Sequence, residues 1–168
     1  MSRGTGVTTI MQTIEPAAIR RYLEEAGIAY RHLTHAATRT SAESAAARGE
    51  PLENGAKALV MKVGESFHLF VLSAARKADS GAIKRFFGVR SARFATPEEL
   101  MKLTGLVPGS VPPFGEPLLP FKLFVDEGVA ALDRVAFNAG ALTESIIMSA
   151  ADYLRAARPA AVFRFAGD

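Results

Sequence analysis

Cysteine is absent from this chain of 168 residues. Without a thiol the protein has no disulfide framework, no thiolate nucleophile and no cysteine-ligated zinc or iron–sulfur site. Any catalysis therefore depends on oxygen or nitrogen groups, or on water. Long apolar runs are also missing, since none approaches the ~20 residues that span a bilayer. The first ten residues lack the apolar core and cleavage site of a secretory signal. We therefore expect a cytoplasmic protein with no membrane partner.

Charge of one sign is only slightly in excess, with a formal net charge of +3 and a pI near 9.4. This balance permits an anionic partner without requiring one. Arg76, Lys77, Lys84 and Arg85 belong to a basic segment, residues 76–93, in which Asp79 is the single acid. Such a segment predicts a positive field that suits an RNA backbone. A solvated basic face is the alternative interpretation.

The composition, 49% hydrophobic and 22% charged, suits one compact domain. We expect residues 13–168 to form that domain and residues 1–12 to form a disordered tail. Helix and strand signals alternate along the chain, which predicts an α/β sheet protein. Helices are predicted from Pro16 to Gly27, from the Thr40–Glu43 capping box to Gly49, from Asp79 to Phe87, from Thr96 through Leu103, and over 150–157. Strands are predicted over 28–33, 56–63, 66–72, 121–125, 134–137, 146–148 and 160–165, with a hairpin turn at Gly64-Glu65.

A loop from Thr104 to Gly115 is the most unusual segment, because it holds three glycines and three prolines with almost no charge. Glycine and proline disfavour regular structure, and the apolar residues in the loop predict that it folds against the body of the protein. The backbone N–H groups of Gly109 and Ser110 are candidate donors to a developing oxyanion. Pro112 and Pro113 have no N–H to donate and provide shape and rigidity.

Five segments follow one another in a specific order: His35 to Thr40 followed by Ser-Ala-Glu-Ser-Ala-Ala, Gly55 to Val60, Leu103 to Gly115, Leu123 to Asp126, and Phe137 to Gly140. In this order, over roughly residues 15–165, the chain resembles the YbaK/prolyl-tRNA-synthetase-associated (ProX-like) family of trans-acting editing domains. The resemblance includes a lysine-bearing strand at Lys57 and a Gly-x-x-x-Pro loop at Gly109 to Pro113.

The resemblance implies a mixed, partly barrel-like β-sheet flanked by helices. It also implies an aminoacyl-tRNA deacylase that hydrolyses the ester of a mischarged tRNA without a cofactor. Because the sequence shows no appended RNA-binding domain, we expect recognition chiefly of the acceptor end of the tRNA, with an aminoacyl-tRNA synthetase as a second partner. The substrate would lie in a cleft beside Lys57 and the loop, with Lys57, Gly109 and Ser110 as the catalytic set. Water or the free ribose hydroxyl would complete the attack.

Lys57 also stands out without the resemblance, because it interrupts an apolar run, where a buried ammonium needs an anion or several acceptors. Lys62, five residues later, points to the opposite face of a regular strand. A lysine exposed at the sheet edge is the alternative for Lys57.

The remaining candidate substrate-binding residues each have a structural alternative. Asp126 matches an acidic position of the family or caps a helix, and Asn138 with Gly140 faces the cleft or forms a simple turn. The His32-x-x-His35 spacing lacks a third ligand at a known interval, so no metal site is predicted. The set is His35, Thr38, Val111, Pro112, Pro113, Phe114, Asp126, Asn138 and Gly140.

Two other functions remain open at this point. The chain could be a non-catalytic module that binds aminoacyl-tRNA or a nucleotide, or an unrelated small-molecule hydrolase. The intact lysine and Gly-x-x-x-Pro loop favour the deacylase.

Overall fold

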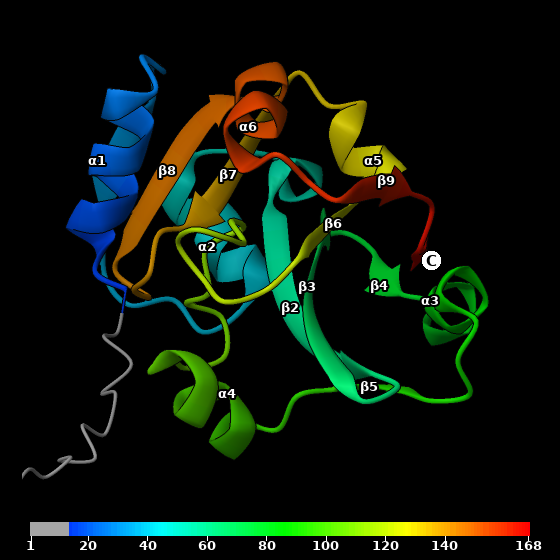
Figure 1. Cartoon of the computed structure of the whole chain (residues 1–168). Helices are drawn as coiled ribbons and strands as arrows, with labels where there is room; N and C mark the ends of the chain where they lie inside the picture. The colour runs from blue at the N-terminus through cyan, green and yellow to red at the C-terminus, as the bar shows by residue number, and fades with distance from the viewer. Residues whose placement is uncertain (1–13) are drawn as a thin grey trace, which may run out of the picture.

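A computed structural model describes residues 14–168 of the chain (Figure 1). The tail predicted over residues 1–12 lies outside the described residues. The α-helices are Pro16–Glu25 (α1), Ser41–Arg48 (α2), Ser80–Phe87 (α3), Pro97–Thr104 (α4), Glu127–Ala130 (α5) and Ala150–Ala157 (α6), and a 3-10 turn covers Leu52–Asn54 (η1). The β-strands are Arg31–Thr34 (β1), Ala56–Val63 (β2), Ser66–Ser73 (β3), Lys77–Ala78 (β4), Ala92–Phe94 (β5), Leu123–Asp126 (β6), Arg134–Asn138 (β7), Glu144–Ser149 (β8), Ala161–Phe163 (β9) and Ala166–Gly167 (β10).

Helix boundaries follow local signals in the sequence. The Thr96 hydroxyl accepts a hydrogen bond from the Glu99 N–H, and the Glu99 carboxylate accepts one from the Thr96 N–H. This reciprocal pair confirms the capping box predicted for α4. At α2 the Thr40 hydroxyl accepts from the Glu43 N–H, but the Glu43 carboxylate accepts from the Arg39 N–H, one residue earlier. Only half of that predicted box is therefore present.

The predicted hairpin is confirmed, because β2 and β3 pair antiparallel on either side of the Gly64-Glu65 turn. β3 pairs parallel with β6 and β6 with β9, which gives a five-stranded mixed sheet in the order β5-β2-β3-β6-β9. A second sheet has the order β1-β8-β7, and β10 pairs with β4. The mixed α/β class flanked by helices is thus confirmed. The partly barrel-like sheet is not, because none of the sheets in the described part of the chain closes on itself.

Two predicted strands are displaced for identifiable reasons. The strand predicted over 28–33 is β1 at Arg31–Thr34, because Ile28 belongs to the capping turn that follows α1. Its N–H donates to the Leu23 carbonyl over 3.0 Å, with Gly27 at a φ of 71° between them, which is the Schellman arrangement. The strand predicted over 160–165 ends at Phe163, and the Phe165 N–H donates to the Asp126 carboxylate instead.

Both faces of the five-stranded sheet are covered by apolar side chains. Alternate residues of β2 and β3 point to opposite faces, so Val60 and Val71 enter one core while Met61 and Phe70 enter another. This two-sided burial explains why the two strands read as nearly continuous apolar runs. The second core includes Ile83 of α3 and Phe163 and Phe165 near the C-terminus.

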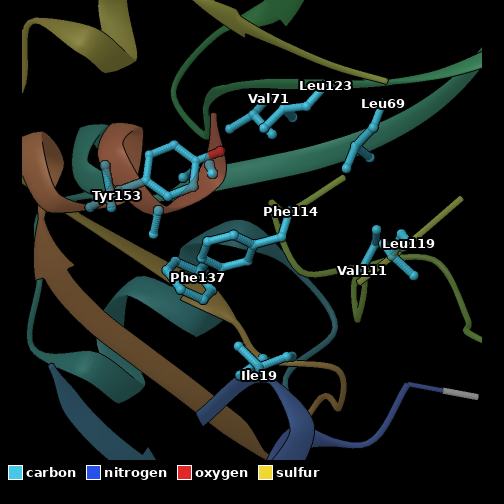
Figure 2. Packing of buried hydrophobic residues seen from close by; sticks show 14 of the residues in the cluster. Ile19, Leu69, Val71, Val111, Phe114, Leu119, Leu123, Phe137 and Tyr153 are labelled. Carbon is cyan, nitrogen blue, oxygen red and sulfur yellow. The ribbon is translucent and has the colours of Figure 1, made fainter. Parts of the chain in front are cut away.

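The first core receives the Gly/Pro-rich loop, as predicted. Figure 2 shows the Phe114 ring directed toward Phe137 and Tyr153, with ring centroids 5.5 and 5.4 Å away. The Tyr153 hydroxyl donates to the Pro113 carbonyl over 2.6 Å. Val111, Phe114 and the aromatic residues around them are buried, so the loop is fixed by packing of its apolar half.

The two larger sheets meet where Gly55, just before β2, forms a parallel bridge with Ala136 of β7. A Cβ at Gly55 would lie 2.8 Å from the Ala74 Cβ, so glycine is the residue that fits this junction. Within residues 14–168, no helix has both the length and the apolar character needed to cross a membrane.

Candidate active site

A cavity of about 190 Å³ lies at this junction between the sheets. α2 and the segment before it, the start of β2, β7 and the Gly/Pro-rich loop all contribute to its lining. The lining includes three cations, and no acid from the described residues. The lining residues are Thr38, Arg39, Thr40, Ser41, Ser44, Arg48, Gly55, Ala56, Lys57, Ala58, Leu59, Ala74, Gly109, Val111, Ala136, Asn138 and Leu142. The cavity therefore suits an electron-rich or anionic group.

Lys57 lines the cavity from the first part of β2. β5 pairs only with Met61 to Val63 of β2, so the earlier residues form an edge that faces the cavity. The Lys57 ammonium donates to the Arg76 carbonyl. Burial, and then repulsion by Lys77, lower the Lys57 pKa from its usual value. Lys62 is not in the lining and lies over the Phe67 ring, in agreement with the predicted opposite face.

Gly109 brings the loop to the cavity with a φ of 91°, a left-handed conformation that favours glycine. The Asn138 side chain donates to the Gly109 carbonyl over 2.6 Å, and the Gly140 N–H donates to the Ser110 carbonyl over 3.0 Å. The Gly109 N–H has no acceptor among residues 14–168. Gly109 thus presents a backbone donor at the cavity edge.

Ser110 does not occupy the position predicted for it. Its N–H and its hydroxyl both donate to the Val107 carbonyl, over 3.1 and 2.8 Å, and its side chain is buried away from the cavity lining. The tight turn from residue 107 to 110 consumes these donors. The predicted pair of catalytic backbone donors is therefore reduced to Gly109.

The second half of the loop also differs from the prediction. Pro112, Pro113 and Phe114 are buried and do not line the cavity, whereas Val111 does. Phe114 belongs to the first core. The prolines have no N–H to donate, so rigidity of the loop is the contribution that agrees with their burial.

Asp126 is a structural residue in this fold. It caps α5 by accepting from the Gly128 N–H over 2.8 Å, and it accepts from the N–H groups of Phe165 and Ala166 over 2.8 and 2.9 Å. It is buried and lies outside the cavity lining. The predicted substrate contact is thus replaced by a tie between β6 and the C-terminal segment.

Arg48 is a buried, charged cavity residue that was not predicted from the sequence. It is the last residue of α2 and 9% exposed. Its Nε donates to the Ser145 hydroxyl over 2.9 Å, and its Nη2 donates to the Asn138 side-chain oxygen over 2.9 Å. Burial lowers the Arg48 pKa to about 10, against a smaller opposing effect of Glu50. Arg48 is thus a desolvated cation that stays charged at neutral pH.

The polar network continues from Arg48 to His35. His35 donates through Nδ1 to the Ala36 carbonyl over 2.8 Å, and its Nε2 lies 2.8 Å from the Ser145 hydroxyl oxygen, within hydrogen-bond distance. His35 and Gly140 do not line the cavity. Both contact the site only indirectly. His35 is bonded to Ser145, which accepts from Arg48, and Gly140 is bonded to Ser110 of the loop.

Thr38 and Ser44 form a buried hydroxyl pair on the cavity wall, with their oxygen atoms 2.7 Å apart. The pair shares one hydroxyl proton, and the second has no protein acceptor in the part of the chain that the structure describes. The predicted contribution of Thr38 is therefore compatible with its position, while Thr40 caps α2 as expected.

The four predicted RNA-binding residues are spread over two elements. Arg76 lies just before β4 and Lys77 is its first residue. The Arg76 carbonyl is the one that accepts from Lys57. Lys84 and Arg85 lie in the last turn of α3. Their contact with RNA stays a prediction. No cluster of three or more His, Asp or Glu that could hold a metal ion occurs in the described residues.

The fold and the cavity together define a class of protein: a mixed α/β domain whose cavity is lined by cations and by a glycine of the Gly/Pro-rich loop. Residues 35–156 match the family described as the aminoacyl-tRNA editing domain, which is most of the chain. The chain belongs to this family.

Particular relatives agree with this assignment. The chain is 41% identical over 143 residues to the multifunctional Ser/Thr-tRNA deacylase ProXp-y of Escherichia coli (strain K12), covering 82% of this chain and 84% of that protein. It is 26% identical over 101 residues to proline–tRNA ligase of Staphylococcus haemolyticus (strain JCSC1435), covering 60% of this chain and 18% of the ligase. A solved structure described as a proposed trans-editing enzyme for prolyl tRNA synthetase superposes with a TM-score of 0.77 at 29% identity, over 91% of this chain and 97% of that one.

Proposed function

We propose that the protein is a trans-acting aminoacyl-tRNA deacylase that hydrolyses the ester bond of a mischarged tRNA. The observation that carries this proposal is that Lys57 and Gly109, which come from separate motifs, line one cavity. Membership of the editing family and the similarity to the E. coli deacylase support the reaction type.

In the proposed reaction Lys57 anchors the terminal nucleotide and Gly109 orients the acyl group. An ammonium has three N–H donors, and the Arg76 carbonyl accepts one of them, so two remain for a phosphate or the ester. No acid or histidine from the described residues lines the cavity as a general base. Hydrolysis needs water as the final acyl acceptor, either directly or after transfer of the acyl group to the free ribose hydroxyl. Positioning as the main source of rate enhancement is consistent with that lining.

The substrate we propose carries a small, hydroxylated amino acid. The E. coli relative is named as a Ser/Thr-tRNA deacylase, and the cavity is smaller than the roughly 300 Å³ at which drug-sized ligand pockets begin. The Thr38–Ser44 hydroxyl pair offers a donor to a side-chain oxygen. A site that hydrogen-bonds a substrate hydroxyl discriminates strongly against an analogue that lacks it.

Recognition of the acceptor end, rather than of the whole tRNA, follows from the small cavity and from the nearby basic residues Arg76 and Lys77. We also propose contact with a synthetase, in line with the similarity to a proline–tRNA ligase. A minihelix that is cleaved as well as the full tRNA would support the first proposal. Co-purification of the chain with prolyl-tRNA synthetase would support the second.

The deciding experiment measures release of labelled amino acid from a panel of mischarged tRNAs by the wild type, Lys57→Ala and Lys62→Ala. Lys62 is the matched control, because it lies on the same strand but outside the cavity lining. We expect release of serine and threonine by the wild type and by Lys62→Ala, and a loss of at least 10-fold in Lys57→Ala. Release from no tRNA would reject the deacylase, and binding without release would favour a non-catalytic module.

A further inference from the structure

Arg48 is a buried cation without a carboxylate partner. No acidic side chain among residues 14–168 forms an ion pair with it, and the nearby Glu50 carboxylate is instead bonded to Arg134 and Asn54. A buried charge is costly unless it is paired or fully hydrogen-bonded. The groups bonded to Arg48 are neutral, and the Glu50 carboxylate acts on it only from a distance.

The hydrogen bonds of Arg48 leave part of its guanidinium unused. A guanidinium has five N–H donors. One N–H goes to the Ser145 hydroxyl, one to the Asn138 side-chain oxygen and one, over 3.5 Å, to the Ala136 carbonyl. Two N–H groups therefore remain on a rigidly held cation that lines the cavity.

The position of Arg48 restricts what can reach these donors. Only 9% of the residue is exposed, so a small terminal atom fits better than a phosphate group within a nucleotide backbone. Asn138 connects Arg48 to the loop, because its oxygen accepts from Arg48 and its nitrogen donates to the Gly109 carbonyl. One side-chain amide thus holds the guanidinium and Gly109 at the same cavity.

We propose that Arg48 is a catalytic residue that binds the carbonyl oxygen of the scissile ester and stabilises the negative charge that develops on it. This inference rests on the proposed deacylase function. It gives the carbonyl oxygen a second, cationic donor, which acts together with the Gly109 N–H. Fixed donors aimed at developing charge in a desolvated site are among the largest contributions to acyl-transfer catalysis.

The step balances as ester hydrolysis. The oxygen of water attacks the carbonyl carbon, and the C=O π electrons move to the carbonyl oxygen, whose charge Arg48 and Gly109 stabilise. When the C=O bond re-forms, the bond to the ribose oxygen breaks and that oxygen takes up one proton of the water. The second proton leaves as the released amino acid ionises at its carboxyl group.

The test is single-turnover deacylation of Ser-tRNA with enzyme in excess, which separates the maximal rate from the half-saturating enzyme concentration. The variants are Arg48→Met, which removes the charge, and Arg155→Met, the matched control at an exposed arginine outside the cavity lining. We expect Arg48→Met to lower the maximal rate by about 10²–10³-fold, as for loss of an oxyanion donor. The half-saturating concentration should change less than about 3-fold, and Arg155→Met should behave as the wild type.

A second pair of variants keeps the test decisive if Arg48→Met does not fold. Arg48→Lys keeps the charge without the planar fork and should lose at least 10-fold in maximal rate while unfolding cooperatively. Arg48→Ala should regain part of its rate when millimolar guanidinium, but not methylammonium at the same concentration, is added. A purely structural role would not produce that selective rescue.

Several outcomes would overturn the inference. An unchanged maximal rate in Arg48→Met, or in folded Arg48→Lys, would do so, as would equal rescue by both cations. A raised half-saturating concentration with a normal maximal rate would assign Arg48 to ground-state binding of a phosphate instead. Inactivity of the wild type toward every mischarged tRNA would reject the deacylase itself, which is distinguishable from a failure of Arg48 alone.

Discussion

Asn138 fixes the position of Gly109, because its side-chain nitrogen donates to the Gly109 carbonyl over 2.6 Å. The two residues are 29 positions apart in sequence and come from a strand and a loop. The same side chain accepts from Arg48, so it has no freedom to turn away. The backbone donor at the cavity edge is thus held by tertiary structure and not by the loop alone.

Asn138→Ala should therefore lower the single-turnover deacylation rate by about 10- to 100-fold, since small displacements of positioning groups have effects of this size. Asn54→Ala is the control, because Asn54 bonds to Glu50 and does not line the cavity. Equal rates for wild type and Asn138→Ala, measured on Ser-tRNA, would contradict the positioning contribution of Asn138.

Gly109→Ala should cost both stability and activity. At a φ of 91° a side chain is strained, and about 1–2 kcal/mol of unfolding free energy is expected to be lost. The new methyl would also lie 3.4 Å from Leu142 in the cavity wall. Gly88→Ala, at a φ of 67° with no atom within 4 Å of the added Cβ, should lose similar stability but retain activity. Urea unfolding and deacylation of both variants check this; equal activity in the two would count against Gly109.

Asp126→Ala should destabilise the fold by about 2–4 kcal/mol, because three backbone N–H groups lose a charged acceptor. Deacylation per folded molecule should stay within about 2-fold of the wild type, since the residue is outside the cavity lining. Urea unfolding gives the first quantity and active-site titration of the folded fraction the second. A stable but inactive variant would restore the substrate-binding interpretation of Asp126.

The pH dependence of stability should include His68. Its ring stacks on that of Phe87, with the two ring centroids 5.2 Å apart. Burial is the main cause that lowers the His68 pKa in the folded state, and repulsion by Lys122 is a smaller one. The unfolded chain therefore takes up a proton first, so the free energy of unfolding falls as pH drops below about 6.5 toward the folded pKa.

His68→Phe removes this proton uptake. Between pH 7.5 and 5.5 the urea midpoint should fall less in His68→Phe than in the wild type. Other titrating groups are common to both proteins, so the difference between the two profiles isolates His68. Parallel profiles would show that His68 protonates equally in both states.

The sequence predicted elements with local causes most accurately. The Thr96–Glu99 capping box and the Gly64-Glu65 turn are decided by neighbouring residues, so their boundaries were found. The start of the strand predicted at 28–33 was misplaced because the Ile28 N–H caps α1 by donating to the Leu23 carbonyl. The apolar character of Ile28 does not distinguish this cap from a strand.

Five candidate residues, Lys57, Thr38, Val111, Gly109 and Asn138, were expected at a cleft and all line the cavity, while their contribution to function stays a prediction. The motif could not show which side chains of the loop point into the cavity and which point into the core. Phe114 shares the loop with Gly109, but its ring packs in the first core, against Phe137 of β7 and Tyr153 of α6.

Arg48 was missed for a similar reason. A basic residue in the last turn of an alanine-rich helix ordinarily interacts with the helix dipole at the surface, and nothing nearby in sequence suggests burial. Its partners Asn138 and Ser145 lie about 90 residues later in the chain, so its environment exists only after β7 and β8 pair beside α2.

The bridge between Gly55 and Ala136 has a consequence for how substrate choice can diverge in proteins of this architecture. Gly55 and Ala136, which have almost no side chain, lie where the two sheets join. In the proposed deacylase, main-chain pairing therefore sets the depth of the cavity at this point. A larger side chain at Gly55 would have to separate the sheets, since even a Cβ there would lie 2.8 Å from the Ala74 Cβ. In the proposed deacylase, selectivity for one amino acid over another then depends on side chains of the cavity wall, such as Thr38, Ser44 and Leu142.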